Sequence, residues 1–443
     1  MRGKYNRRVY FAYNVLLALA LILSAPWWVL EMLRHGKYRA GLGERVGCVP
    51  ARLRGAKGQA TIWIHAVSVG EVLAMSRVIE ELKTRLPGWR VVVSTTTDSG
   101  QRLAGERFGE KNVFYLPLDF TFAVKAYLGA LQPHLLVLAE SEFWPNLLRR
   151  ARTTGVRVAV VNARVSDRSL PRYRRFRSLL RRVMRSVDVF LAQSKLDAQR
   201  LVEIGAPAER VLLGGNLKFE VKPPGNVQIA EDFAVALVRD AIGPVIAAGS
   251  TLEGEEQMLL ECFRQVRDQH PSAMMVLAPR HPERFAPAAA LLESSQLRWE
   301  RRSAWDGRQL PAGGVFLLDS IGELAALYQF ADIAFVGGSL VPKGGHNVLE
   351  AAQFGVAILV GPHTENFRDI IRIFQQSQAL RVVARETLAA TVLELLANPE
   401  PCRQLGQRAL EVLRTEQGAT SRTVEALMSL LGVPPNLHME TRA

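Results

Sequence analysis

The sequence predicts an α/β protein with two Rossmann-like domains facing a cleft, preceded by an apolar N-terminal helix. Short β-branched runs alternate with amphipathic segments of helical length along the chain, as in parallel sheets covered by helices on both faces. At 443 residues the chain is too long for one ordinary core. We therefore expect an anchor at residues 1–35, a first domain at 36–220 and a second at 226–443.

The apolar stretch runs from Val9 to Leu33 and is interrupted by Asn14, Ser24, Pro26 and Glu31. As a helix it would be roughly 37 Å long, enough to cross a hydrocarbon core of about 30 Å. Trp27 and Trp28 near its end suit a membrane interface. No A-x-A cleavage pattern follows it, which disfavours a cleaved signal peptide. We expect an anchor that either spans the membrane or lies shallowly in it.

In the first half, strands are predicted at 61–65, 90–95, 113–116, 135–139, 156–162, 189–193 and 211–213. In the second half they are predicted at 244–248, 274–278, 315–318, 333–336 and 357–360. Helical patterns such as 72–86 and 143–152 lie between them. The glycine- and proline-rich segment 214–225 reads as the linker between the two domains.

Basic residues are concentrated in the first half. The formal charge balance is +19 over residues 1–220 and −5 over the remainder, so an anionic partner is expected for the first half. Between Arg164 and Arg185 there are nine arginines and one acidic residue, with apolar residues at helical spacing. This predicts a basic amphipathic helix that either contacts anionic headgroups or packs on its own domain. No aromatic stacking platform accompanies it, so no nucleic-acid partner is expected.

In the second half, the strand at 333–336 runs into two glycine-rich segments, and a helix is expected to begin near Asn347. Glycines there allow close backbone approach to a ligand, and a helix N-terminus favours a phosphate. Glu350 suits a ribose diol, although Asn-x-x-Glu is also a capping box that needs no ligand. Arg280 suits a phosphate because guanidinium binds it bidentately. The candidate nucleotide-binding residues are Ser250, Arg280, His281, Gly338, Ser339, Gly345, Asn347 and Glu350.

Polar residues also follow the first-half strands, where the carboxyl ends of parallel strands meet. Helix capping is the alternative explanation for several of them. The candidate acceptor or cleft residues are Ser68, Gly70, Glu71, Glu140, Glu142, Arg164 and Arg168.

The sequence contains no Asp-x-Asp motif, no His/Cys cluster with metal-ligand spacing and no GxxxxGK[ST] loop. Its three cysteines are far apart and are expected to be reduced thiols. We expect neither a metal nor a cofactor. Two Rossmann-like domains around a cleft are shared by one large class of nucleotide-sugar glycosyltransferases, and the loops have to decide the function.

As a set, the motifs resemble the 3-deoxy-D-manno-octulosonic acid (Kdo) transferase family of lipid A biosynthesis. They occur in the family's order and cover nearly the whole chain: RAGLGERVG at 39–47, HAVSVGE at 65–71, ESEFWPN at 140–146, NARVSDRS at 162–169, GNLKFE at 215–220, PRHPER at 279–284 and GGSLVPKGGHNVLE at 337–350.

The resemblance implies the GT-B architecture, with CMP-Kdo as donor substrate and the lipid A precursor as acceptor. It implies that Glu44 is the catalytic base and that Arg280, Gly338, Asn347 and Glu350 hold CMP-Kdo. It also implies an inverting reaction at the cytoplasmic side of the inner membrane, next to phospholipids. Two alternatives stay open: a UDP-sugar transferase of the same architecture, and a non-enzymatic membrane module. The sequence does not determine the oligomeric state.

Overall fold

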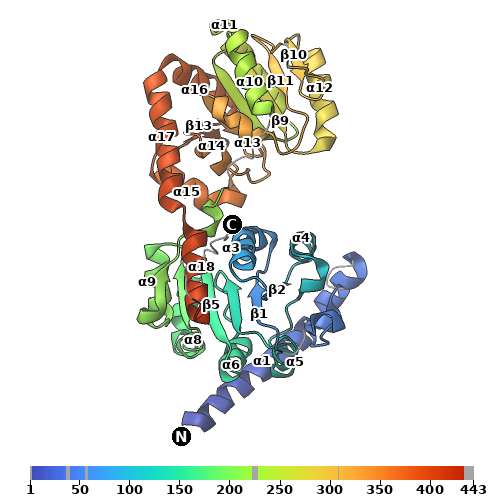
Figure 1. Ribbon diagram of the computed structural model, residues 1–443, viewed down its shortest axis with the longest axis vertical. Helices are drawn as coiled ribbons and strands as arrows, with labels where there is room; N and C mark the ends of the chain where they lie inside the picture. The colour runs from blue at the N-terminus through green and yellow to red at the C-terminus, as the bar shows by residue number, and fades with distance from the viewer. Residues whose placement is uncertain (1, 36–39, 55–57, 222–227, 308, 434–443) are drawn as a thin grey trace, which may run out of the picture. The chain divides into compact units, whose positions relative to one another are not determined.

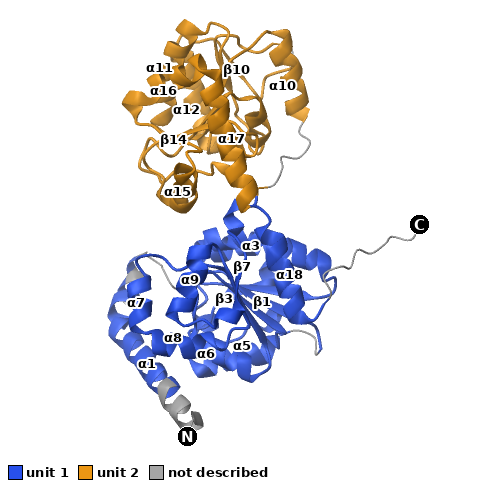
Figure 2. Ribbon diagram, turned by 90° about the vertical axis from the view of Figure 1, so that its left-hand side faces the viewer, with its two compact units in different colours: residues 1–220, 417–443 blue, residues 221–416 orange. Residues whose placement is uncertain are grey.

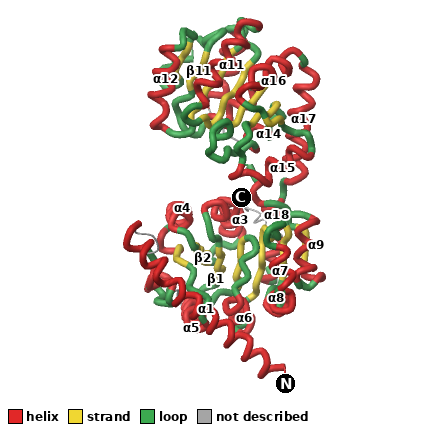
Figure 3. Tube along the Cα trace, turned by 180° about the vertical axis from the view of Figure 1, so that it is seen from behind, coloured by secondary structure: helices red, strands yellow, loops and turns green. Residues whose placement is uncertain are grey.

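A computed structural model describes residues 2–35, 40–54, 58–221, 228–307 and 309–433. The chain divides into two compact units, residues 1–220 with 417–443, and residues 221–416 (Figure 2). Each unit holds a parallel seven-stranded sheet with helices around it (Figures 1 and 3). The predicted fold class is confirmed.

The sheet of unit 1 has the strand order β3-β2-β1-β4-β5-β6-β7. Because the order reverses direction between β1 and β4, the carboxyl ends of these two strands form the switch point at which α/β sheets bind ligands. The strands are β1 (Thr61–His65), β2 (Arg90–Thr95), β3 (Val113–Tyr115), β4 (Leu135–Ala139), β5 (Arg157–Ala163), β6 (Val189–Ala192) and β7 (Val211–Leu213).

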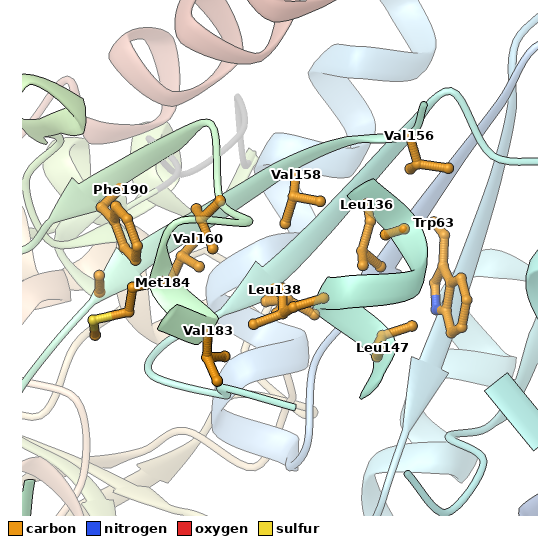
Figure 4. Packing of buried hydrophobic residues seen from close by; sticks show 14 of the residues in the cluster. Trp63, Leu136, Leu138, Leu147, Val156, Val158, Val160, Val183, Met184 and Phe190 are labelled. Atoms are coloured by element: carbon orange, nitrogen blue, oxygen red, sulfur yellow. The ribbon is translucent and has the colours of Figure 1, made fainter. Parts of the chain in front are cut away.

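The helices of unit 1 are α1 (Arg2–His35), α2 (Leu42–Arg45), α3 (Val69–Arg85), α4 (Asp98–Phe108), α5 (Thr121–Leu131), α6 (Pro145–Thr153), α7 (Leu170–Arg175), α8 (Arg177–Met184), α9 (Lys195–Ile204) and α18 (Ala419–Leu431). On one face of the sheet, Leu136, Leu138 and Val160 pack with Leu147 of α6 and Met184 of α8 (Figure 4). On the other face, α3 and α18 share a second core with the sheet.

The predicted second domain is wrong at its C-terminal end, because α18 belongs to unit 1. Val424, Leu427 and Met428 of α18 are buried in the core that also holds Ile64 and Val78. Burial of this apolar face against α3 and the sheet explains why the chain returns to unit 1.

The predicted linker is also wrong over its described part, because residues 214–220 are built into unit 1. Leu217 and Phe219 are buried, and the Leu217 backbone N–H donates to Asn162 Oδ1 at 3.1 Å. Glu220 accepts from Arg77 and from the Thr420 backbone N–H. Residues 222–225 of the predicted linker lie outside the described residues.

The arginine-rich segment forms two short helices, α7 and α8, with a break at Phe176, where one long helix was predicted. The predicted apolar face is partly borne out: Val183, Met184 and Val187 are buried in the core of unit 1. Phe176 and Leu179, in contrast, are 51% and 39% exposed. The α8 segment therefore packs on unit 1 through one face and exposes apolar side chains to solvent on another.

Helix α1 contains a stretch, Tyr10–Trp28, that is long and apolar enough to cross a membrane. Asn14, the polar interruption in that stretch, accepts from Asn146 Nδ2 at 3.1 Å. The Arg149 guanidinium lies 4.3 Å from the centre of the buried Tyr10 ring. Beyond these contacts α1 exposes large apolar side chains, among them Phe11, Leu16, Leu19, Ile22, Leu23 and Trp27.

The sheet of unit 2 has the order β10-β11-β9-β8-β12-β13-β14, with its switch point between β8 and β12. Its strands are β8 (Val245–Thr251), β9 (Met274–Pro279), β10 (Trp299–Arg301), β11 (Val315–Leu317), β12 (Ile333–Val336), β13 (Ala357–Val360) and β14 (Arg381–Val382). The sequence patterns missed the edge strands β10 and β14, which are three and two residues long and too short to show a periodicity.

The helices of unit 2 are α10 (Gln228–Arg239), α11 (Glu255–Gln269), α12 (Phe285–Ser294), α13 (Leu324–Leu327), α14 (Leu349–Ala352), α15 (Arg368–Gln376), α16 (Arg385–Ala397) and α17 (Pro399–Glu416). Phe263 of α11 and Leu405 of α17 are buried in one core with Phe335 of β12.

Candidate functional site

Three carboxylates gather at the switch point of unit 1. Glu71 lies in the first turn of α3, after β1, while Glu140 and Glu142 follow β4. Burial, together with smaller contributions from the carboxylates of Glu140 and Glu142, raises the pKa of Glu71 to about 7 against the lowering effect of its hydrogen bonds from Val67 and Ser68. Burial also raises the pKa of Glu142, with a smaller contribution from Glu140. The structure thus brings together three of the predicted cleft residues.

The Glu71 carboxylate also has a structural task. It accepts from the Val67 backbone N–H at 2.8 Å and from Ser68 Oγ at 3.1 Å. This satisfies a donor of the β1–α3 loop, but Ser68, at the N-cap position of α3, makes no capping hydrogen bond with its side chain. Gly70 is exposed, and a Cβ added there would meet no atom within 4 Å. No steric requirement for glycine exists at that position.

Basic groups flank these acids. Lys218 Nζ lies 3.2 Å from Glu140 Oε1. The Arg164 backbone N–H donates to Ser141 Oγ at 3.2 Å, which ties the loop after β5 to the loop after β4. Arg168 is exposed in the turn before α7, and no contact of its side chain with the carboxylates is seen.

Glu44 lies in α2, and its carboxylate is held at two points. Oε2 accepts from the Tyr115 backbone N–H at the end of β3 at 2.8 Å, and Oε1 accepts from Arg52 Nη2 at 2.7 Å. The Glu44 side chain is 15% exposed. A carboxylate fixed in this way is oriented and still open to solvent, which suits a general base.

Gly41 lets α2 approach β3 closely. It has a φ of 69°, and a Cβ added there would lie 1.9 Å from Cδ2 of Tyr115. The backbone N–H of the same Tyr115 holds Glu44. The neighbouring Arg45 lies over the Tyr115 ring at 4.4 Å and donates from Nη2 to the Thr96 carbonyl at 2.7 Å. The glycine in this motif therefore serves the position of the carboxylate.

In unit 2, Glu255 shapes the loop that follows β12. It is fully buried at the start of α11, and its two carboxylate oxygens accept from four backbone N–H groups. These belong to Leu252, Gly338, Ser339 and Leu340, at distances of 2.6 to 2.9 Å. One side chain thus fixes the loops after β8 and β12 at the switch point.

Three predicted nucleotide-binding residues, Arg280, His281 and Glu350, lie near His346 beside that loop. Burial raises the pKa of Glu350, and the Arg280 guanidinium opposes this shift. Burial, together with the nearby charges of Arg280 and His281, lowers the pKa of His346 to about 4. Arg280 and His281 are exposed at the end of β9. Gly338 has a φ of 68°, and a Cβ there would lie 2.8 Å from the His346 ring. Ser250 has a φ of 55° at the end of β8.

Three expectations about this loop are wrong in detail. The helix expected near Asn347 is the single turn α14, so it offers little helix dipole. The Gly345 N–H donates to the Gly338 carbonyl at 2.7 Å and is not available to a ligand. Ser339 is buried, and its Oγ donates to the Val336 carbonyl and accepts from the Gly361 N–H. Asn347 Oδ1 accepts from the Leu349 N–H at 3.1 Å, which partly bears out the capping alternative.

The comparisons with known proteins decide the family. A family model described as 3-deoxy-D-manno-octulosonic-acid transferase (kdotransferase) matches residues 40–221. Over 432 residues the chain is 38% identical to the 3-deoxy-D-manno-octulosonic acid transferase of Bordetella pertussis, covering 94% of this chain and 98% of the relative. The chain belongs to the Kdo transferase family. It is a glycosyltransferase that transfers Kdo, a reaction of lipopolysaccharide biosynthesis.

A second relative is equally complete. The enzyme of the same name from Haemophilus influenzae is 32% identical over 432 residues, 95% of this chain and 98% of the relative. Among solved structures, the UDP-GlcNAc 2-epimerase of Neisseria meningitidis bound to UDP-GlcNAc has a TM-score of 0.52 at 14% identity, covering 83% of this chain and 100% of that one. This likeness shows the fold alone. Family membership excludes the non-enzymatic alternative.

Sequence reasoning missed the residues that support the candidate site residues. Arg52 and Tyr115 hold Glu44, Glu255 holds the glycine loop, and Lys218 pairs with Glu140. In the sequence, Glu255 follows the glycine-containing end of β8, and this position was the one local signal for it. Three of its four partners are 83 to 85 residues further along the chain, so no local pattern connects them to Glu255. Among the described residues, no group of three or more His, Cys, Asp or Glu side chains is arranged to hold a metal.

The raised pKa of Glu71 predicts a pH dependence of stability. With a folded pKa of about 7 against an ordinary value of 4.5, the folded state keeps a proton that the unfolded state has lost between these two pH values. The contribution of Glu71 to stability is therefore fully present below pH 4.5 and is lost as the pH rises through 7, by up to about 3 kcal/mol. Glu71→Gln should remove this fall, because the amide oxygen still accepts from Val67. Thermal unfolding of both proteins from pH 5 to 8 measures it, and parallel pH profiles would contradict it.

Proposed function

We propose that this Kdo transferase uses CMP-Kdo as donor and the lipid A precursor as acceptor, at the cytoplasmic side of the inner membrane. Glu44 is its general base, and the reaction inverts the anomeric centre without a metal or cofactor. The supporting observation is the place of Glu44 beside the apolar helix. The Arg45 carbonyl accepts from the Leu118 N–H at 2.7 Å, while Thr121, three residues on, contacts Asn14 of α1. The base is thus on the side of unit 1 where α1 docks.

The chemistry follows from this arrangement. The Glu44 carboxylate takes the proton of an acceptor hydroxyl, whose oxygen forms the new bond to the anomeric carbon. The bond from that carbon to the phosphate oxygen of CMP-Kdo breaks, and CMP leaves with the electron pair. The exposed Arg280 guanidinium neutralises the charge on the leaving phosphate, and Glu350 accepts from the ribose hydroxyls. Attack opposite to the leaving group gives inversion.

The contacts of α1 favour shallow insertion in the membrane over spanning. Tyr10 and Asn14 are engaged by unit 1. The part of α1 from Val15 to Leu30 has 16 residues, about 24 Å as a helix, against about 30 Å for the hydrocarbon core. A helix held along the protein in this way presents its apolar face to the lipid. Phospholipids are therefore proposed partners of α1.

The test is transfer by the purified, detergent-solubilised protein, with CMP-Kdo and tetraacylated lipid A precursor as substrates. Mass spectrometry of the lipid product should show an increase by one or more Kdo units, and the number added is read directly. If a folded sample binds CMP but forms no product, the proposed acceptor is wrong. Protection by UDP and not by CMP in a competition experiment would overturn the donor.

A further inference from the structure

A groove lined by arginines lies in unit 1 between α8 and the segment that leads from α9 to β7. Its volume is about 560 Å³. Among the described residues that line the groove, one is acidic, Glu209. The arginines that line it are Arg152, Arg177, Arg181, Arg185 and Arg210.

The three arginines from α8 and its C-terminal end share one face and lack carboxylate partners. Arg177, Arg181 and Arg185 are spaced four residues apart, so they lie above one another on the helix surface. In the described part of the chain, no carboxylate is within ion-pair distance of these three. Like charges at this spacing destabilise a helix unless an anion lies between them.

Other arginines of the same region do have partners. Arg174 pairs with Glu203, and Arg200 pairs with Asp167. Arg210 is fixed by donating from Nη1 to the carbonyls of Arg185 and Val187, at 3.1 and 2.8 Å. Of the arginines that line the groove, Arg210 is positioned by carbonyls and Arg152 pairs with Asp188 at 3.5 Å. The three on α8 and its C-terminal end are available to a ligand.

The groove adjoins the docking site of α1. Tyr10 of α1 is within electrostatic reach of Arg182 on α8, as it is of Arg149 on α6. Figures 1 and 3 show α6 and α8 at the side of unit 1 along which α1 runs. The exposed apolar side chains of Phe176 and Leu179 lie on the same helical segment as the arginines. Phe176 and Leu179 point to the opposite side of α8 from Arg177, Arg181 and Arg185, so they add exposed apolar surface to this segment without lining the groove.

We propose that this groove binds the phosphate headgroup of an anionic membrane phospholipid. The inference rests on the proposed membrane association of α1. The phosphate oxygens accept from Arg177, Arg181 and Arg185, and the acyl chains leave the groove on the side of Arg152, one turn of α6 beyond the Arg149 that contacts Tyr10 of α1. Phosphate is the ligand class because its oxygens match guanidinium donors bidentately.

The topology separates this headgroup from the reacting acceptor. Glu44 is held by β3 at one edge of the seven-stranded sheet, whereas the groove borders the segment before β7 at the other edge. Six strand spacings of about 4.8 Å place the two edges roughly 29 Å apart. A disaccharide whose hydroxyl is at Glu44 does not extend that far. The groove therefore binds a second lipid, which fixes the orientation of unit 1 on the bilayer.

The experiment uses the full chain in a neutral detergent, titrated with dihexanoyl phosphatidylglycerol. Hydrogen exchange of peptides covering α8 and residues 205–210 reports occupancy and yields an apparent Kd. The groove variant is Arg177→Gln/Arg181→Gln/Arg185→Gln. It should weaken binding by about 100-fold, given the usual contribution of basic residues near anionic lipid. The control, Arg107→Gln/Arg298→Gln/Arg372→Gln, removes the same charge from exposed positions outside the groove and should keep the original Kd.

Each arm has a decisive outcome. Equal protection by dihexanoyl phosphatidylcholine, or equal weakening in the control variant, would overturn the proposal. Equal protection by inorganic phosphate at the same concentrations would show that the groove binds a free anion, and would overturn the phospholipid as its ligand. If the triple variant unfolds, Arg181→Gln alone should still weaken binding about fivefold. Because this readout needs no Kdo transfer, a failed transfer assay with lipid bound would count against the proposed function alone.

Discussion

Glu44→Gln is expected to lower Kdo transfer by about 100- to 10,000-fold while leaving CMP binding unchanged. The amide has nearly the shape of the carboxylate, and its oxygen still accepts from the Tyr115 N–H. It cannot take the proton of the acceptor hydroxyl. The donor residues belong to the other unit, so the affinity for CMP should not respond.

The measurement is single-turnover transfer, combined with calorimetric titration of CMP. The matched control is Glu106→Gln on α4, an exposed glutamate of the same unit, which should transfer at the original rate. Retained turnover in Glu44→Gln would overturn the assignment of the base. A parallel loss of CMP binding would indicate a general folding defect instead.

Glu255→Gln is expected to abolish measurable CMP binding and to destabilise unit 2. The Glu255 carboxylate accepts four backbone N–H groups in a fully buried place. An amide offers one oxygen and brings an NH₂ group against N–H donors, so buried donors lose their partners. Each buried donor left without a partner costs about 1–3 kcal/mol. The loops after β8 and β12 then lose their shared support.

Thermal unfolding and CMP titration of the same samples test this prediction. Glu253→Gln is the control, because Glu253 is two residues away with a side chain that is 85% exposed. It should change neither quantity measurably. Native CMP affinity in Glu255→Gln would show that the loop keeps its conformation without this carboxylate.

Several features of this protein were readable in the sequence because they depend on neighbours along the chain. The continuous apolar strands, the glycine loop after β12 and the apolar stretch of α1 all follow from local composition and spacing. Order along the chain also placed Glu71 and Glu140 after β1 and β4, where parallel sheets collect ligand-binding groups, and Glu350 in the helical turn after the glycine loop. The resemblance of the motifs added the family, which the comparisons confirm.

Tertiary structure alone decided which residues support these groups. Arg52 and Tyr115 hold Glu44 across 8 and 71 residues of sequence, and Glu255 reaches a loop more than 80 residues away. It also returned α18 to unit 1, broke the arginine-rich segment at Phe176 and gathered Arg152, Arg181 and Arg210 around one groove. Hydrogen bonds and buried contacts of this kind form between segments that only folding brings together, and a single sequence carries no local periodicity that records them.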